Sequence, residues 1–516
     1  MGEKAPLIIV GRKVGMIWLL GFAVLGALAL FVRALNLCHE RFHPDELIAT
    51  TIVPRLGVET WDTNWELHPL PEIFRYSQYN FSSYLYFAAV WWRLWEPIFG
   101  HSADHAMILH ALRAFNLVAV VLSLAVMGWW AARWRGWWFA MVAMLLWFAD
   151  PLSTMDAHFA RVETWLSAVT LLVIVLVASD PKPGECTRLD RRRLVLSGVL
   201  IGLAAATKIT MVLLVLVPAV VLAARYRRGR EKEMVVGLLC LAVPILLGFF
   251  LGAPYAVLEP RTFLSGVEFL RAQYSMIHVP FANLDGRPVW TLMMQYWLGN
   301  YGTAYCVLAL CGAWALCKEG PVGLGMVFLI LANVFLFGSR TTFFERNLSP
   351  VQPLIALCAT FGLVAAWGLI QRLPSPRWLR QGAFAALTIV AVLPMVVLTA
   401  KIVVEGFGTS AEARAVAFIS SQRAQFPDRE LRYARLVADD AVQQHLESLV
   451  ATDESVLLLV PDYSDPFTEK NCELLVQNPF VSIREVARYE GPFARYPRST
   501  MQDYLGSGFR LFVSRP

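Results

Sequence analysis

Eleven apolar stretches constrain what this chain can fold into more than any other feature of its sequence. Their residue ranges are 14–35, 107–130, 137–150, 158–178, 194–206, 209–224, 234–256, 290–316, 321–338, 351–370 and 381–404. Most approach the roughly 20 residues that a helix needs to cross a bilayer. Only 16% of the 516 residues are charged, whereas roughly a quarter are charged in a soluble domain. The sequence therefore predicts a polytopic α-helical membrane protein with about eleven transmembrane helices.

The basic residues of the loops indicate how these stretches are oriented. They cluster before the first stretch and after the second, fourth, sixth, eighth and tenth, at Lys4, Arg12, Lys13, Arg133, Arg135, Lys182, Arg188, Arg191, Arg192, Arg193, Arg225, Arg227, Arg228, Arg230, Lys318, Arg372, Arg377 and Arg380. Placing every cluster in the cytoplasm satisfies the positive-inside rule. Residues 194–224 then form a short helical pair that turns near Lys208. Regions 36–106, 257–289 and 339–350 face outward.

Two apolar segments have a second interpretation. The first stretch contains Ala-Leu-Ala at 27–29, which resembles a signal-peptidase site. It is longer than the roughly 7–15 residues of a signal-peptide core, so we predict a retained helix. Residues 81–100 contain Arg93 and Glu96, and a crossing there would reverse the side of the next basic loop. We predict that they form a helix lying in the membrane interface.

The chain divides into a membrane part and a soluble part. Residues 1–404 hold the apolar stretches and the external loop 36–106. From Glu405 onward the sequence turns polar, with strand-like segments at 431–437, 455–460 and 509–513 and helical segments at 439–449 and 466–476. Residues 405–516 are therefore predicted to form a small α/β domain on the non-cytoplasmic side.

The segment His43-Pro44-Asp45-Glu46, just outside the first helix, is the strongest local candidate for chemistry. Proline followed by two acids is typical of a helix N-terminus, where the helix dipole favours negative charge. A carboxylate that is partly desolvated at the membrane face can also serve as a general base. Both interpretations stay open from the sequence.

A second group, Asp156, His158, Arg161 and Glu163, lies at the outer start of the fourth stretch. It predicts either a buried ion-pair network between helices or part of a site. Cations on the same side suit an anionic lipid headgroup, although any one of them could instead extend to ordinary headgroups. They are Lys208, Arg340, Arg346, Arg75 and Arg261.

Other chemistries find little support in the sequence. The net charge of +6 is spread over short loops and does not form a nucleic-acid-binding patch. None of the eight cysteines has zinc-site or redox spacing, and no cluster demands a metal.

Several motifs together resemble the GT-C superfamily of lipid-carrier-dependent membrane glycosyltransferases. Within it, the chain is similar to the group of protein O-mannosyltransferases and lipid A aminoarabinose transferases. The motif His43-Pro44-Asp45-Glu46 is also similar to that of mannosyltransferases of the lipid-linked oligosaccharide and GPI pathways. Glu163 stands where an Asp is more usual in the group. The matching pieces, in order, are 43–46, the long loop after them, His158 with Arg161 and Glu163, 202–208, 253–255 with 259–260, and 346–350.

The resemblance implies a sugar donor on a polyprenyl or dolichyl phosphate and a lipid, glycan or protein acceptor, with no cofactor required. In such a reaction Asp45 is placed to accept the acceptor's proton, with inversion at the sugar. Glu46 and Glu163 would orient the acceptor or stabilise charge on the ring, and Lys208 and Arg346 would hold the departing phosphate. Further substrate-binding candidates are His43, His158, Arg161, Arg340 and Arg75.

A bacterial inner membrane, with the site facing the periplasm, is the expected location. Two other classes of protein remain open. A transporter or flippase for lipid-linked sugars would also carry intramembrane charges, although we find no internal repeat of the kind typical of transporters. A non-catalytic assembly protein would tolerate neutral substitutions at Asp45 and Glu163.

Overall fold

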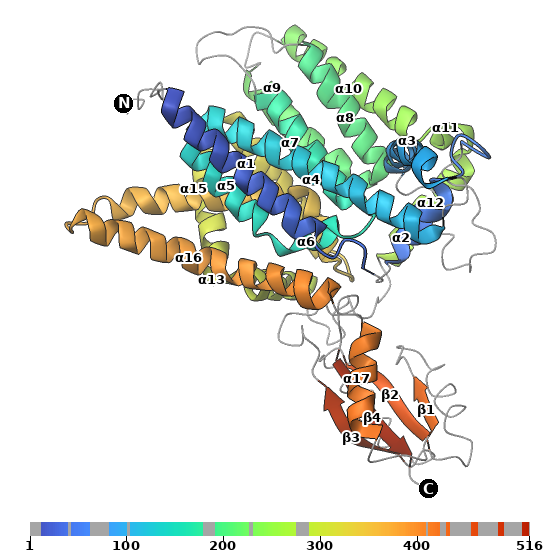
Figure 1. Cartoon of the computed structure of the whole chain (residues 1–516). Coiled ribbons are helices and arrows are strands. Elements are labelled where there is room, and N and C mark those ends of the chain that lie inside the picture. Colours follow the sequence, from blue (N-terminus) through green and yellow to red (C-terminus); the bar gives the residue numbers. More distant parts are fainter. Residues whose placement is uncertain are drawn as a thin grey trace.

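The computed structural model describes residues 12–39, 43–61, 82–100, 104–178, 191–225, 231–274, 288–408, 411–423, 430–433, 456–462, 483–489 and 508–514. Most of them belong to one body of long helices that lie side by side (Figure 1). Its long helices are α1 (Arg12–Ala34), α4 (His105–Arg135), α5 (Trp137–Phe148), α7 (Glu163–Ala178), α8 (Arg191–Thr207), α9 (Leu216–Arg225), α10 (Glu231–Gly252), α13 (Val289–Cys317), α14 (Pro321–Gly338), α15 (Gln352–Ile370) and α16 (Arg377–Lys401).

Shorter helices supply the connections that carry the candidate site. Four of them, α2, α3, α11 and α12, gather at one end of the bundle (Figure 1). The short elements are α2 (Pro44–Ile52), α3 (Ser82–Phe99), α6 (Pro151–Ala157), η2 (Ile209–Val215), α11 (Tyr255–Leu258), α12 (Pro260–Gln273), η3 (Glu345–Val351) and η4 (Ile402–Phe407), of which η2 and η3 are 3₁₀-helices and η4 is a π-helix.

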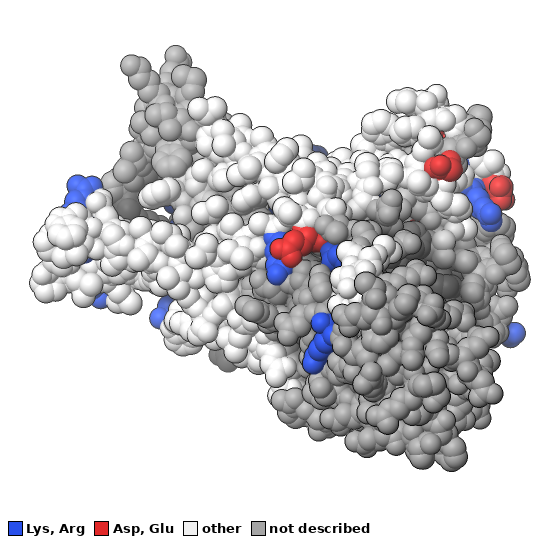
Figure 2. Space-filling model, turned by 60° about the horizontal axis from the view of Figure 1, so that its bottom comes forward, with Lys and Arg blue, Asp and Glu red and all other residues white. Residues whose placement is uncertain are grey.

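Six helical segments in the described part of the chain are long and apolar enough to cross a membrane, and α5 with α6 makes a seventh, bent by 64°. The segment 209–224 and helix α7 are apolar but shorter. Charged side chains are sparse on the described surface seen in Figure 2. The fold is thus that of a multi-spanning helical protein, as predicted. The predicted count of eleven crossings is not confirmed, because several apolar stretches form shorter or broken helices among the described residues.

Close backbone contacts at glycines hold pairs of long helices together. A Cβ on Gly202 of α8 would lie 2.2 Å from the carbonyl oxygen of Ile245 in α10. A Cβ on Gly312 of α13 would lie 1.7 Å from the carbonyl oxygen of Cys358 in α15. Small residues are typical of helix interfaces in membranes, because they let two backbones approach. Packing of this kind fixes α8, whose end carries the candidate-site residue Lys208.

Helix α3 coincides with the predicted interfacial helix at 81–100. Leu85 and Trp92 are buried, whereas Val90 and Leu94 are exposed on the opposite side. Arg93 donates to the carbonyl oxygens of Pro54 and Leu56 and pairs with Glu96 at 2.6 Å. These bonds satisfy the charged pair within the protein. Helix α3 is not among the candidate membrane spans.

A smaller unit holds α17 (Ala411–Arg423) and the strands β1 (Glu430–Tyr433), β2 (Val456–Asp462), β3 (Ile483–Tyr489) and β4 (Gly508–Ser514). The sheet has the order β1-β2-β4-β3, with β1 parallel to β2 and the other pairs antiparallel. Strands β1, β2 and β4 overlap the three predicted strands, and β3 was not predicted. The predicted helices at 439–449 and 466–476 lie outside the described residues.

The predicted domain boundary after residue 404 falls inside a continuous helical segment. Helix α16 passes directly into η4, which ends at Phe407. The Phe407 ring is buried and stacks on His158 at 4.2 Å and on His39 at 4.4 Å between ring centroids. The helical body therefore continues to residue 407.

Candidate active site

The His43-Pro44-Asp45-Glu46 segment forms the N-terminus of α2. His43 is the N-cap residue, and its Nδ1 accepts a hydrogen bond from the Asp45 N–H at 3.1 Å. The Glu46 carboxylate accepts one from the His43 N–H at 2.9 Å, which completes a capping box. Pro44 occupies the first turn, where no N–H donor is needed. The helix-terminus interpretation of the motif is confirmed.

Glu46 is fully buried, and its carboxylate is saturated with donors. Arg113 of α4 donates to both carboxylate oxygens, at 2.9 and 3.1 Å, and the Ala160 N–H donates at 2.7 Å. With the His43 bond, four donors connect α2, α4 and the segment between α6 and α7. A carboxylate so occupied is suited to positioning the chain rather than to meeting a substrate.

Asp45 has a different environment, although it is the neighbour of Glu46. Its Oδ2 accepts a hydrogen bond from Nη1 of Arg346 at 2.8 Å, between residues 301 positions apart in the sequence. The same nitrogen lies 2.9 Å from Nε2 of His43. Burial, with the nearby charges of Arg161 and Arg346, holds the pKa of His43 well below its usual range. The ring is therefore neutral at physiological pH.

The second acidic group forms a chain of buried charges at the start of α7. Lys208 Nζ lies 3.3 Å from Oε1 of Glu163, and Arg161 Nε lies 4.0 Å from its Oε2. Arg161 also pairs with Asp156, and the three residues Asp156, Arg161 and Glu163 are at most 2% exposed. Two cations thus compensate two carboxylates where water has little access, as burial of charge requires.

The element η3 connects the two acidic groups. Arg346 contacts Asp45, while Ser349 in the next turn donates to Oδ2 of Asp156 at 2.5 Å. The Ser349 carbonyl accepts a bond from Ser167 of α7 at 2.8 Å. Side chains from α2, α6 and the loop before α15 therefore meet in one region. The sequence motifs at 43–46, 156–163 and 346–350 are brought together.

The N-terminus of α6, the helix that carries Asp156, is fixed by a buried cap. Asp150 accepts a bond from the Ser153 N–H at 2.5 Å. Its other oxygen accepts bonds from Tyr301 at 3.0 Å and Gln352 at 2.7 Å, on α13 and α15. The position of α6 is thereby tied to two long helices of the bundle.

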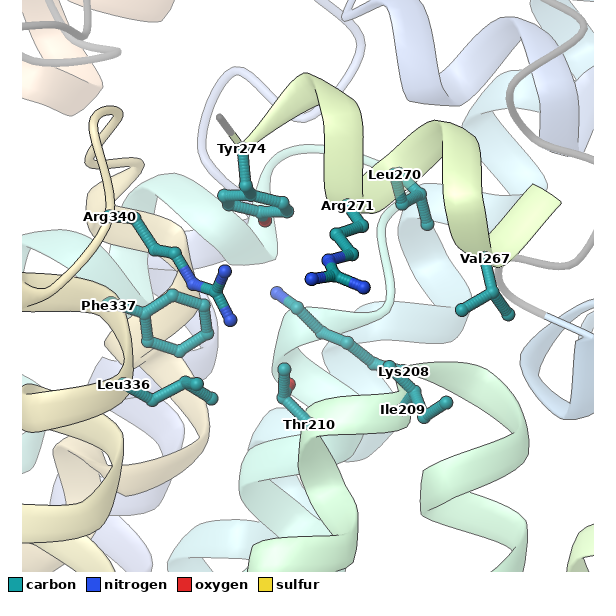
Figure 3. A pocket seen from close by; sticks show the side chains of 10 residues that line it. All are labelled: Lys208, Ile209, Thr210, Val267, Leu270, Arg271, Tyr274, Leu336, Phe337 and Arg340. Atoms are coloured by element: carbon teal, nitrogen blue, oxygen red, sulfur yellow. The ribbon is translucent and has the colours of Figure 1, made fainter. Parts of the chain in front are cut away.

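A cavity of about 270 Å³ opens beside these ion pairs, between the start of η2, helix α12 and the end of α14. In Figure 3 the charged ends of Lys208, Arg271 and Arg340 point toward one another across it. Tyr274 lines the same cavity, and its hydroxyl lies 3.2 and 3.0 Å from the side-chain oxygen and nitrogen of Asn347. Burial raises the pKa of Tyr274, so the phenol adds no negative charge. The remaining lining residues are mostly apolar: Ile209, Val267, Leu270, Leu336, Phe337 and Thr210.

Several candidates from the sequence lie elsewhere. His158 is fully buried, and its ring nitrogens face the carbonyl oxygens of Thr154 at 2.7 Å and Leu35 at 3.0 Å, so it joins helices. Arg75 lies outside the described residues. Sequence reasoning missed Arg113 and Arg271. A lone arginine inside an apolar stretch could have indicated the buried role of Arg113.

No group of three or more His, Cys, Asp or Glu residues that could hold a metal ion occurs among the residues that the structure describes. Four cations, Lys208, Arg271, Arg340 and Arg346, lie in or next to the cavity. Such an arrangement can bind an anion with carboxylates close behind it.

Comparison with solved structures supports the GT-C resemblance at the level of fold. The aminoarabinose transferase ArnT from Cupriavidus metallidurans, in the apo state, matches with TM-score 0.52 and 17% identity over 97% of this chain and 98% of that chain. The same protein bound to undecaprenyl phosphate matches with TM-score 0.50 and 16% identity over the same shares.

The Archaeoglobus fulgidus oligosaccharyltransferase tethered with an acceptor peptide matches with TM-score 0.52 and 12% identity over 80% of this chain and 58% of that chain. No family model matches the chain, and no curated protein matches it in sequence. At these identities the comparisons establish architecture. The chain therefore shares its fold with these two solved transferases, as the resemblance of its motifs predicted.

Proposed function

We propose that this protein transfers a sugar from a polyprenyl-phosphate donor to an acceptor at the non-cytoplasmic face of the membrane. The observation that carries the proposal is the cavity in which Lys208, Arg271 and Arg340 converge beside two buried acidic groups. A structure with the same fold has been solved with undecaprenyl phosphate bound. The apolar lining of the cavity suits the first units of such a lipid, and its cations suit the phosphate.

The cations provide what the departing group needs. When the sugar leaves, the bond between its anomeric carbon and the phosphate oxygen breaks, and the electron pair stays on the phosphate. Lys208, Arg271, Arg340 and Arg346 would stabilise that charge, which is the largest electrostatic demand of the reaction. Attack from the side opposite the phosphate inverts the configuration of the sugar.

Asp45 would act as the general base. The acceptor hydroxyl or amine loses a proton as it attacks, and a carboxylate near the phosphate-binding cations can receive it. Asp45 faces Arg346, whereas Glu46 is saturated by four donors. Glu46 is therefore assigned a positioning role. Glu163, next to Lys208, would orient the acceptor or stabilise positive charge on the sugar ring.

The orientation predicted from the basic loops puts this site outside the cytoplasm. An ion pair between Arg135 and Glu319 supports it, since both follow helices whose basic ends are predicted to be cytoplasmic. The contact of Asp45 with Arg346 joins two segments that are both predicted to be external. We infer a bacterial inner membrane with the site on the periplasmic side.

The direct test is to incubate the purified protein with a panel of polyprenyl-phosphate sugars and a membrane extract that supplies the acceptor, and to measure release of the lipid phosphate together with transfer of the sugar. We expect one donor to be consumed, and Asp45→Asn to abolish transfer while the protein still folds and inserts. Full activity of that variant would remove Asp45 from the mechanism. Movement of an intact donor across proteoliposomes without transfer would instead indicate a transporter.

A further inference from the structure

Arg346 contacts the proposed base, Asp45, and is also one of the cations proposed to bind the donor phosphate. One of its guanidinium nitrogens contacts both Asp45, at 2.8 Å, and His43, at 2.9 Å. The guanidinium also lies over the ring of Phe344, 5.2 Å from the ring centroid. Asp45, the proposed base, is therefore hydrogen-bonded to a cation that also suits the donor phosphate.

In both cation–carboxylate pairs of the site, the cation is more exposed to solvent than the carboxylate. The Arg346 side chain is 21% exposed and that of Asp45 is 9% exposed. The Lys208 side chain is 13% exposed and that of Glu163 is 3% exposed. An anion that enters the site therefore meets the cations before it meets the carboxylates. Arg346 has several N–H donors in one plane, so it can exchange a carboxylate for a phosphate without losing its charge partner.

We propose that the donor phosphate and Asp45 compete for Arg346, so that donor binding frees the base and must precede productive binding of the acceptor. This inference rests on the proposed function. With the donor bound, Arg346 turns to the phosphate, and Oδ2 of Asp45 becomes available to the acceptor. The acceptor proton then passes to Asp45, its oxygen or nitrogen bonds to the anomeric carbon, and the electron pair of the broken bond leaves on the phosphate beside Arg346.

Competition has a consequence that is separate from catalysis. Coupling between two groups that share one partner is reciprocal, so removing the Asp45 charge must strengthen phosphate binding. The experiment measures the affinity of purified, detergent-solubilised protein for undecaprenyl phosphate. We expect Asp45→Asn and Asp45→Ala to bind it about fivefold or more tightly than the wild type, although neither transfers sugar.

A matched control and a double-mutant cycle make the test specific. Glu96→Gln removes the same charge from a pair with Arg93 on α3 and should leave the affinity unchanged. Arg346→Met should weaken binding, and adding Asp45→Asn to it should give no gain. An unchanged or weaker affinity in both Asp45 variants would refute the competition, and so would a gain that persists without Arg346. If the wild type neither binds undecaprenyl phosphate nor transfers sugar, the proposed function itself fails.

Discussion

Asp45 and Glu46 are adjacent acids of the same charge, yet the structure assigns them opposite phenotypes. Glu46→Gln replaces a carboxylate that four donors occupy, two of them from Arg113. Both side chains of that ion pair are 0% exposed, so the substitution leaves a buried guanidinium uncompensated. Breaking such a pair costs about 3–5 kcal/mol. Asp45→Asn loses one charge-assisted bond to a partly exposed arginine, which costs about 1 kcal/mol.

The assay is thermal unfolding in detergent, followed by tryptophan fluorescence at one fixed scan rate, because membrane proteins often unfold irreversibly. We expect Glu46→Gln to lower the unfolding temperature by several degrees and Asp45→Asn to leave it nearly unchanged. Sugar transfer should show the reverse sensitivity, with Asp45→Asn inactive and folded Glu46→Gln protein partly active. An Asp45 variant that is as unstable as the Glu46 variant would contradict the division of roles.

Three further outcomes follow from the described contacts. Arg271→Met should weaken binding of undecaprenyl phosphate about tenfold, whereas Arg261→Met on the same helix, which does not line the cavity, should not. Burial lowers the pKa of His43 in the folded protein, so only the unfolded chain takes up a proton there as the pH falls through 6.5. Stability should therefore decrease below that pH, and a His43→Asn variant should show a smaller decrease when unfolding is measured against pH. Gly312→Ala should destabilise the protein by about 1–3 kcal/mol, because its Cβ would meet a backbone oxygen 1.7 Å away, whereas Gly368→Ala, with nothing within 4 Å, should be neutral in the same thermal assay.

Much of the architecture could be predicted, because helices that lie in a lipid bilayer need long apolar stretches, which are easily seen in a sequence. Apolar length and loop charge predict a multi-spanning bundle, and they put the motifs at Asp45, Glu163 and Arg346 on the same side of the membrane. Composition does not predict where each regular α-helix begins and ends. Residues 209–224, for example, are uniformly apolar but begin as a 3₁₀-helix before α9.

The roles of individual charged residues were harder to predict. Successive residues of a helix point about 100° apart, so Asp45 and Glu46 meet different partners, and only tertiary packing decides which one is saturated. The sequence does not distinguish Arg271 from other arginines of the outer segments, because its role depends on how α12 lies beside η2 and α14. Arg113 lies within an apolar stretch, and its partner Glu46 is 67 residues away in the sequence, so no local pattern indicates their ion pair.

The stacking of Phe407 has a practical consequence for separating the two parts of the protein. This ring covers the imidazoles of His158 and His39, and His158 lies in the same short connection as Asp156 and Arg161. Deleting every residue from Glu405 onward would remove Phe407 and expose both imidazole rings. The segment that carries Asp156 and Arg161 would then lose packing contacts. Phe407 thus belongs to the helical body, and a cut that spares this body should be made after residue 408.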